Sequence, residues 1–310
     1  MSLPLLVVIL GPTASGKTSL SMHVAEQLQG EIVSCDSVAV YRELEIGTAK
    51  PSQEERRRVP HHLIDIAGPA ESVTAGDYSR RARQAVGDIS ARGHLPIVVG
   101  GSGLYLRALL EGLFAGPPRS EELRGRFRER ATERGAEYLH KVLRRMDPAA
   151  ARAIHANDVP KVVRALEVSI GARTPMTGLW QQGRDALQGY RVLRVGLNPD
   201  REALYARINQ RAKEMFSAGL LEETRTLMER YGSSAWPLNS LGYKQAMQHL
   251  RGELSFEQAV IAAQQGHRNY AKRQMTWFRR EPDVHWIADF GSNPAAQKEI
   301  VDLIKASTGD

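Results

Sequence analysis

Apolar residues along this chain fall into short continuous runs separated by longer amphipathic segments. The run at residues 5–10 predicts a strand buried on both faces, and the segments at 31–35, 95–99 and 190–197 also have strand character. The segments between them repeat their apolar positions every three or four residues, which is the helical period. Strands that alternate with helices predict an α/β fold, with a parallel sheet flanked by helices.

Signals for helix ends support this pattern. An apolar series from Leu20 to Leu28 stops before Gly30, which predicts the end of the first helix. Near the other end of the chain, Ser255 and Gln258 have the spacing of a capping box. They predict a helix that continues through the basic and aromatic segment that follows them.

The pattern changes after the Gly-Pro-Pro sequence at 116–118. As far as residue 183 the segments are helical and rich in arginine, without a convincing strand. We therefore predict a core made of residues 1–116 and 189–310, interrupted by an all-helical insertion domain at 117–188.

The chemistry is expected where the first strand meets the first helix. Residues 11–18, Gly-Pro-Thr-Ala-Ser-Gly-Lys-Thr, fit the pattern G-x-x-x-x-G-K-[ST] of phosphate-binding loops (P-loops). In such a loop, backbone N–H groups and the positive end of the helix face an anion. Lys17 adds a positive charge, and the Thr18 hydroxyl can hold Mg²⁺. The sequence therefore predicts a P-loop NTPase-like core that binds a diphosphate together with Mg²⁺.

A carboxylate follows the second predicted strand. Ligands of parallel sheets gather at the carboxyl ends of the strands, so Asp36 is expected to face the P-loop. There it could accept a proton from an acceptor substrate, or bind Mg²⁺ through water. The alternative is that Asp36 caps the next helical turn.

Two other features allow two interpretations each. The Gly-Gly-Ser-Gly sequence at 100–103 offers further backbone donors at the same sheet edge, or simply makes a tight turn. Arg207 and Arg211 are four residues apart, so they lie on one face of a helix. They suit either a clamp on a leaving diphosphate or a salt-bridged surface helix.

Positive charge is concentrated in two stretches. The chain has 310 residues and a net charge of +7; residues 119–164 contain 12 Lys and Arg against 7 Asp and Glu, and residues 265–280 contain 5 and none. Such stretches suit a polyanionic partner, and basic residues mixed with aromatic ones suit phosphate contact and base stacking. A solvated helix face is the alternative.

Other residue types exclude several classes of protein. The single cysteine, Cys35, excludes an intramolecular disulfide and a cysteine metal cluster. The adjacent His61 and His62 lack an accompanying metal motif, so we expect them to shape a loop. No apolar run approaches the roughly 20 residues that span a bilayer, and the first residues lack the basic region of a signal peptide. We therefore expect a cytoplasmic protein without membrane segments.

Nine motifs occur in order along nearly the whole chain. They are GPTASGKT at 11–18, DSVAVY at 36–41, GTAKP at 47–51, HHLID at 61–65, TAGDY at 74–78, VVGGSGLYL at 98–106, RALEV at 164–168, LGYKQ at 241–245 and AKRQMTWF at 271–278. Together they resemble the tRNA dimethylallyltransferases, or tRNA isopentenyltransferases, of the IPP transferase family.

This resemblance implies a reaction. Dimethylallyl diphosphate would donate its dimethylallyl group to N6 of the adenosine at position 37 of tRNA, just 3′ of the anticodon. The P-loop core would bind the diphosphate with Mg²⁺, and the helical insertion would bind the tRNA anticodon stem-loop. We expect a monomer.

The resemblance also implies roles for individual residues. Asp36 would be the general base, with Lys17 and Arg211 as the other catalytic residues and Thr18 as the metal ligand. The implied diphosphate-binding residues are Gly11, Pro12, Thr13, Ala14, Ser15, Gly16, Lys17 and Thr18. The implied tRNA-binding residues are Asp36, Ser37, Val38, Ala39, Ser102, Arg124, Pro160, Lys161, Val162, Val163, Arg164, Asn239, Ser240, Leu241, Gly242, Tyr243, Lys244, His267, Arg268, Asn269, Tyr270, Ala271, Lys272, Arg273 and Gln274.

The chain departs from the family pattern at two places. Ala39 stands where the family usually has Gln, and Pro160-Lys161 stand where it usually has Gln-Arg. Both departures concern expected tRNA contacts and leave the expected chemistry intact. The competing functions are a small-molecule or nucleotide kinase that binds ATP at the same loop, an RNA-binding NTPase, and an isopentenyltransferase that acts on free adenine nucleotides.

Overall fold

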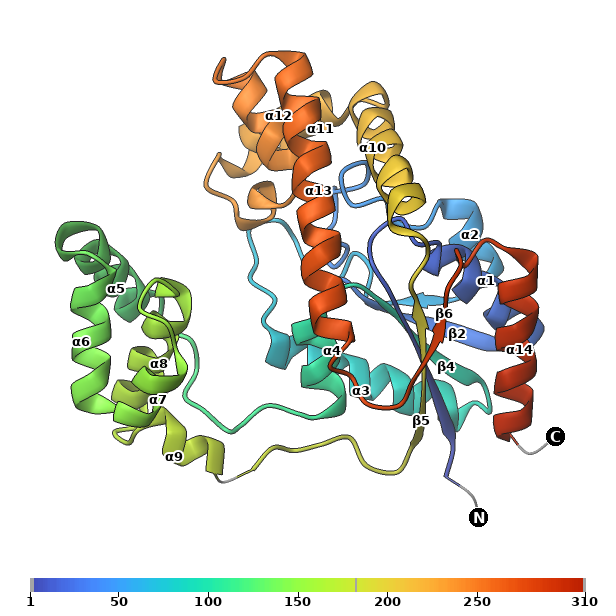
Figure 1. The fold of residues 1–310 in the computed structure, drawn as a ribbon, viewed down its shortest axis with the longest axis horizontal. Coiled ribbons are helices and arrows are strands. Elements are labelled where there is room, and N and C mark those ends of the chain that lie inside the picture. Colours follow the sequence, from blue (N-terminus) through green and yellow to red (C-terminus); the bar gives the residue numbers. More distant parts are fainter. Residues whose placement is uncertain (1–2, 182, 309–310) are drawn as a thin grey trace. The chain divides into compact units, whose positions relative to one another are not determined.

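The computed structural model describes residues 3–181 and 183–308. Within these residues six strands form one parallel sheet in the order β3-β2-β4-β1-β5-β6. The strands are β1 (Leu5–Leu10), β2 (Gly30–Cys35), β3 (His61–His62), β4 (Leu95–Gly100), β5 (Arg191–Leu197) and β6 (Val284–Ile287). The predicted α/β fold with a parallel sheet is confirmed, and Figure 1 shows the sheet between layers of helices.

Two strands depart from expectation. His61 and His62 form the short edge strand β3, paired with Ile32 and Val33, rather than part of a loop. The other edge strand, β6, was not predicted. Both strands are too short to show a recognisable pattern of apolar residues. They adopt strand conformation because they pair with a longer neighbouring strand.

Alternate residues of the central strand β1 supply two separate cores. Leu6, Val8 and Leu10 face one side of the sheet, and Leu5, Val7 and Ile9 face the other. All are buried, as expected for a parallel sheet covered on both faces.

Helices cover each face. On the Leu5 side lie α1 (Lys17–Gln27) and α14 (Pro294–Thr308), which run beside each other. On the Leu6 side lie α3 (Ala75–Ala91) and α4 (Gly103–Leu110). The same core continues into α10 (Arg201–Ser217), α11 (Leu220–Tyr231), α12 (Tyr243–Leu250) and α13 (Phe256–Phe278). Two short helical segments, α2 (Gln53–Arg58) and η1 (Trp236–Asn239), lie in the connections.

Helix ends test the predicted signals. Ser255 and Gln258 form the predicted capping box at the start of α13. The first helix, however, ends at Gln27, and Gly30 is already part of β2. A side chain at position 30 would lie 2.5 Å from Ile97 Cδ1, so this glycine permits close packing of the strand rather than ending the helix.

The chain divides into two compact units. One takes the described residues within Met1–Leu110 and Leu187–Asp310, and the other is Glu111–Ala186. The second unit contains α5 (Glu121–Arg134), α6 (Ala136–Met146), α7 (Pro148–Ala153), α8 (Val159–Gly171) and α9 (Met176–Gln181), around its own apolar core. The predicted insertion, 117–188, starts at the Gly-Pro-Pro sequence, whereas the observed unit already includes residues 111–116.

Among the described helices, none has the length and the apolar character needed to cross a membrane.

Candidate functional site

A cavity of about 1160 Å³ opens at the carboxyl ends of the strands. Its walls come from the P-loop after β1, from Asp36 after β2, and from Gly100 and Gly101 at the end of β4. Arg207 and Arg211 of α10 and Tyr270 and Gln274 of α13 complete this part of the wall. The predicted concentration of site residues at one sheet edge is therefore present.

The P-loop forms a cradle, and the segment that follows β6 packs against it. Gly16 has a positive φ of 89°, and a Cβ there would lie 2.9 Å from the backbone nitrogen of Gly291. Gly291 N donates to Ser15 O at 2.9 Å, so the segment after β6 packs directly on the loop. Only glycine fits position 16, because both its conformation and its contact exclude a side chain.

Two side chains of the cradle are placed where an anion could be bound. The Ser15 hydroxyl is buried and has no hydrogen-bond partner among the described residues. Lys17 Nζ donates to the carbonyl oxygens of Gly11 and Pro12, each at 2.8 Å, within its own loop. A buried hydroxyl and an ammonium group turned onto backbone carbonyls fit a site built for an anion.

The charges around the cradle favour an anion. Burial, together with the neighbouring Arg211, lowers the pKa of Lys17 to about 7, although Asp36 opposes this shift. Burial likewise lowers the pKa of Arg211, with Asp36 acting in the opposite direction. Two cations that repel each other in a partly desolvated cavity are stabilised by a diphosphate bound to both.

Asp36 makes the expected capping contacts, and its role as a proton acceptor stays a prediction. Its Oδ1 accepts hydrogen bonds from Val38 N at 2.8 Å and Ala39 N at 3.1 Å, which is the capping role. The residue also lines the cavity. In the described part of the chain Oδ2 accepts no hydrogen bond, so this oxygen can accept a proton while Oδ1 holds the carboxylate in place.

The two arginines of α10 both reach the cavity. The Arg207 guanidinium lies 3.6 Å from the ring centroid of Phe290, and its NH1 donates to the Ser292 hydroxyl at 3.3 Å. Arg211 lies deeper and borders a small adjoining space with Thr13 and His267. Their position in one wall favours the clamp over a surface helix.

The second glycine loop is joined to the P-loop through α13. Gln274 Oε1 accepts from Thr13 N at 2.8 Å, and Gln274 Nε2 donates to Gly101 O at 3.0 Å. A Cβ at Gly101 would lie 2.1 Å from Gln274 Nε2. Tyr270 also donates to Gly101 O, at 3.3 Å. The loop at 100–103 therefore needs small residues to receive α13.

Ser102 and His267 were both predicted to contact tRNA. The Ser102 hydroxyl accepts from Ser37 N at 3.0 Å, which connects the ends of β4 and β2. Burial and the neighbouring Arg211 lower the pKa of His267 to about 4, so its imidazole is neutral near pH 7. Its Nε2 has no hydrogen-bond partner among the described residues.

The predicted tRNA-binding segments contain both buried and exposed residues. Those whose side chains belong to the protein interior are Ala39, Val162, Val163, Tyr243, Ala271 and Gln274. Those exposed on the surface are Pro160, Lys161, Asn239, Lys244, Asn269, Lys272 and Arg273. Direct contact with RNA is expected of the exposed group, and these roles stay predictions.

Arg124 and Arg164 are held by a buried carboxylate. Glu167, whose side chain is 1% exposed, accepts hydrogen bonds from Arg124 Nε at 3.0 Å and from Arg164 NH1 at 2.7 Å. It also caps the start of α5 through Ser120 N at 2.6 Å. These arginines are thus fixed inside the helical unit.

The protein groups available for a metal are few. The described residues contain no cluster of three or more His, Cys, Asp or Glu side chains arranged to hold a metal ion. His61 contacts Val59 O, and His62 contacts Glu31. Thr18 is exposed to the cavity. Magnesium held by one hydroxyl and by phosphate oxygens is consistent with this donor set.

Sequence reasoning missed one wall of the cavity. Thr48, Ala49, Lys50 and Pro51 line it, and Glu223 of α11 holds the preceding residues. The GTAKP motif was noticed only as part of the resemblance. No sequence motif marks Glu223, because most of its partners are backbone N–H groups.

Comparison with known proteins agrees with this geometry. The family model described as IPP transferase matches residues 39–281. The chain is 64% identical over 307 residues to a tRNA dimethylallyltransferase of Koribacter versatilis (strain Ellin345), covering 99% of this chain and 100% of the relative. It is 52% identical over 305 residues to one of Solibacter usitatus (strain Ellin6076), covering 98% and 99%.

Solved structures give the same result. A tRNA isopentenylpyrophosphate transferase from Bacillus halodurans aligns with a TM-score of 0.72 and 37% identity, covering 97% of this chain and 96% of that one. A eukaryotic dimethylallyltransferase described as acting on tRNA aligns with a TM-score of 0.79 and 25% identity, covering 98% and 77%. The chain therefore belongs to the IPP transferase family, that of the tRNA dimethylallyltransferases, and is a prenyltransferase.

Proposed function

We propose that the protein transfers a dimethylallyl group from dimethylallyl diphosphate to N6 of adenosine 37 in the anticodon loop of tRNA. The observation that carries this proposal is one cavity in which a P-loop, two arginines and Asp36 meet. Relatives of high identity along the whole chain bear the name of this activity.

The reaction exchanges one bond for another. The N6 nitrogen forms a bond to the allylic carbon, while the bond from that carbon to the diphosphate oxygen breaks. The electron pair leaves with the diphosphate, and the proton of the amino group goes to Asp36 Oδ2. Asp36 is oriented for this by the two backbone N–H groups that hold Oδ1.

The leaving group determines the rest of the site. The loop N–H groups at the start of α1, Lys17, Arg207 and Arg211 would stabilise the charge that develops on the diphosphate. Mg²⁺, when bound, would supply further positive charge at these oxygens. Thr18 is the protein group that would hold it.

The basic surface fits the acceptor. The target base has to leave the stacked loop, which costs a few kcal/mol that contacts to the remaining anticodon stem-loop must offset. The exposed cations Lys272 and Arg273 of α13 and Lys161 of α8 would bind its phosphates. A kinase acting on a small metabolite needs no such surface.

The decisive experiment uses labelled dimethylallyl diphosphate. The protein is incubated with Mg²⁺ and unmodified tRNA and, separately, with labelled ATP and candidate hydroxyl substrates. We expect label in tRNA, at N6 of the adenosine 3′ of the anticodon. Labelled free adenine nucleotide, or phosphate transfer from ATP alone, would overturn the proposal.

A further inference from the structure

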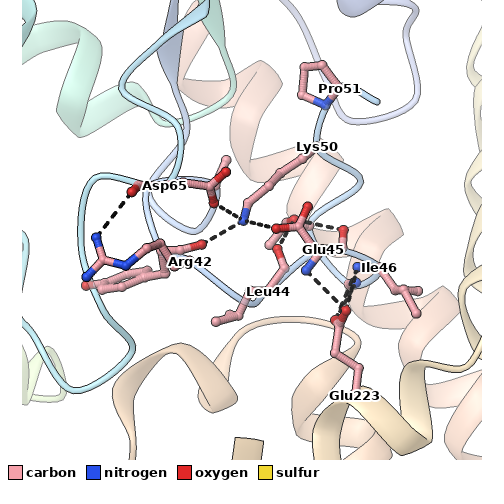
Figure 2. Close-up of polar contacts among 12 residues, drawn as sticks. Arg42, Leu44, Glu45, Ile46, Lys50, Pro51, Asp65 and Glu223 are labelled. Atoms are coloured by element: carbon pink, nitrogen blue, oxygen red, sulfur yellow. Dashed lines mark hydrogen bonds and ion pairs between the residues drawn. The ribbon is translucent and has the colours of Figure 1, made fainter. Parts of the chain in front are cut away.

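One wall of the cavity is a loop without regular secondary structure. We define the wall loop as residues 44–51; its last four residues, Thr48 to Pro51, line the cavity. Loops of this kind are mobile unless other elements hold them. Two separate groups of contacts hold this one, and Figure 2 shows both.

The first group centres on Glu223 of α11. The carboxylate accepts hydrogen bonds from three successive backbone N–H groups of the wall loop: Glu45 N at 3.2 Å, Ile46 N at 3.0 Å and Gly47 N at 3.4 Å. Charge-assisted bonds to successive N–H groups are stronger than neutral ones. Glu223 therefore fixes the backbone that leads into the cavity wall.

Tyr243 of α12 completes this contact. Its hydroxyl donates to Glu223 Oε1 and accepts from Gly47 N at 3.2 Å. The ring is fully buried, and a Cβ at Gly47 would lie 2.3 Å from it, so the loop backbone packs closely against the ring. Tyr243 thus acts here inside the protein, although its segment was predicted to contact tRNA.

The second group centres on Lys50, whose side chain is 1% exposed. Its ammonium donates to Tyr41 O at 2.7 Å, Glu45 Oε1 at 3.0 Å and Asp65 Oδ1 at 2.6 Å. Three donors meet three acceptors, which leaves no N–H for a substrate. Arg56 also binds Asp65, at 2.6 Å. Lys50 therefore anchors the end of the wall loop and is not a diphosphate ligand.

The cavity-lining residues of the wall loop differ in character from those of the P-loop. Ala49 and Pro51 face the cavity from it, and Met22, Ile32 and Ile64 are further apolar lining residues. The P-loop, Lys17 and Arg211 offer charge and N–H groups, which suit the diphosphate. The apolar part suits the hydrocarbon part of the donor.

We propose that Glu223 and Tyr243 are positioning residues for the prenyl donor, which hold the wall loop against its hydrocarbon group and keep water from it. This inference rests on the proposed function. Its chemical consequence concerns a side reaction. If water enters, its oxygen forms a bond to the allylic carbon, the carbon–oxygen bond to diphosphate breaks, and a proton goes to solvent; dimethylallyl alcohol and diphosphate result.

The test compares diphosphate released with dimethylallyl group transferred to tRNA, together with the KM for the donor. The ratio is independent of the fraction of folded enzyme, so a variant that is merely less stable leaves it unchanged. The variants are Glu223→Gln, which replaces an accepting oxygen by a donor, and Tyr243→Phe, which keeps the ring. Glu222→Gln is the control, since Glu222 on the same helix is exposed and its ion pair is with Arg225.

For the parent enzyme and for Glu222→Gln we expect a ratio near one. Loss of hydrogen bonds that hold the loop should raise the donor KM roughly fivefold or more in both test variants and raise the ratio above one, with kcat within about threefold. The double variant should be less than additive, because both residues act through Gly47 N. If Glu223→Gln fails to fold, Tyr243→Phe alone decides the question.

Two other outcomes are distinguishable. A parent enzyme that transfers no label to tRNA overturns the proposed function itself. A parent that transfers label, with test variants that match it in donor KM and in the ratio, overturns only the positioning role.

Discussion

At the scale of the residue, the base role proposed for Asp36 depends on how its carboxylate is held. Its Oδ1 is engaged by Val38 N and Ala39 N, so the backbone determines where Oδ2 points. Replacement by asparagine keeps the shape and Oδ1 but removes the proton acceptor. The expected loss is about a hundredfold to ten-thousandfold in the single-turnover rate.

The measurement is rapid-quench transfer to tRNA with enzyme in excess over labelled donor. Affinities for donor and tRNA should stay within a few-fold of the parent, and the melting temperature should change little. A variant that binds poorly or melts early would instead assign Asp36 to the fold. A variant that reacts at the parental rate would exclude it as the base.

Lys17 gives a prediction about pH. Its pKa in the free cavity is about 7, and only the protonated form attracts the diphosphate. The donor Kd should therefore increase as the pH rises above 7, by a factor that approaches tenfold for each pH unit. Well below pH 7 Lys17 stays protonated, so the Kd should not change with pH because of this group. Calorimetric titration with dimethylallyl diphosphate and Mg²⁺ between pH 6.5 and about 9 measures this.

Two variants separate the charge of Lys17 from the rest of the cradle. Lys17→Arg keeps a cation at every pH in this range, so the slope should disappear. Thr18→Ala should weaken binding but keep the slope, because Lys17 is unchanged. A parental Kd that stays constant up to pH 9 would show that the ammonium group does not lose its proton there.

At the scale of the element, the amino end of β2 is held by one buried carboxylate. Glu31 accepts hydrogen bonds from Arg92 NH2 at 2.8 Å, next to the end of α3, and contacts ring nitrogens of His62 on β3 and His94 at 2.7 Å each. Burial opposes its ionisation, but hydrogen bonds from His62, Arg92 and His94 outweigh burial and lower its pKa to about 2. Glu31 thus joins a short edge strand and a helix end to the sheet.

This carboxylate should make stability depend on pH. The folded-state pKa lies below the ordinary value of 4.5, so the contribution is complete above pH 4.5 and is lost as the pH falls towards 2. Glu31→Gln should reduce the free energy of unfolding at pH 7 by about 2–4 kcal/mol. The difference from the parent should shrink in acid, as measured by urea unfolding at pH 7 and pH 3.

The control is Glu299→Gln. Glu299 pairs with His285, and both side chains are exposed, so its loss should cost less than about 1 kcal/mol. If Glu31→Gln and Glu299→Gln reduce the free energy of unfolding equally, the buried contacts of Glu31 add nothing to stability.

The elements also show what the sequence could predict. Long apolar runs and the capping box determined β1, β2, β4, β5 and the start of α13 almost to the residue. Strand β3 depends on pairing with β2, and Glu223 acts through the backbone of a loop distant in sequence. Such contacts depend on which segments lie close together in the fold, and neither apolar periodicity nor a local motif predicts this. The residues of the cradle were predictable because the P-loop carries its own local signature.

At the scale of the whole molecule, we expect tRNA binding to depend on where the positive charges lie more than on the net charge of +7. Exposed cations expected to bind tRNA occur in both units: Lys272 and Arg273 in one, and Lys161 in the other. Arg268 is a poorer probe, because it donates to Asn209 on α10 and so helps to hold α13. The two units have separate cores, so changes in one should not disturb the fold of the other.

We therefore predict additive losses of tRNA affinity. Each phosphate contact removed should reduce the slope of log affinity against log salt by about 0.7–0.9. Replacing both Lys272 and Arg273 by alanine should lower the slope by up to about twice that amount. Lys161→Ala should lower it by at most the amount for one contact. Combining all three should give the sum, since Lys161 belongs to a unit with its own core, separate from that of the unit that contains Lys272 and Arg273. Fluorescence titration of tRNA at several salt concentrations measures the slopes.

The matched control removes two lysines from another face of the molecule. Lys298 and Lys305 are exposed on α14, which packs on the Leu5 side of the sheet, whereas α13 packs on the Leu6 side. Their replacement by alanine lowers the net charge as much as the Lys272 and Arg273 pair does, yet should leave the slope unchanged. Affinity for dimethylallyl diphosphate should stay constant in every variant, because none of these residues lines the cavity. If the α14 variant lowers the salt slope as much as the α13 variant does, tRNA binding depends on the total charge of the protein. Lys272, Arg273 and Lys161 would then have no special role in it.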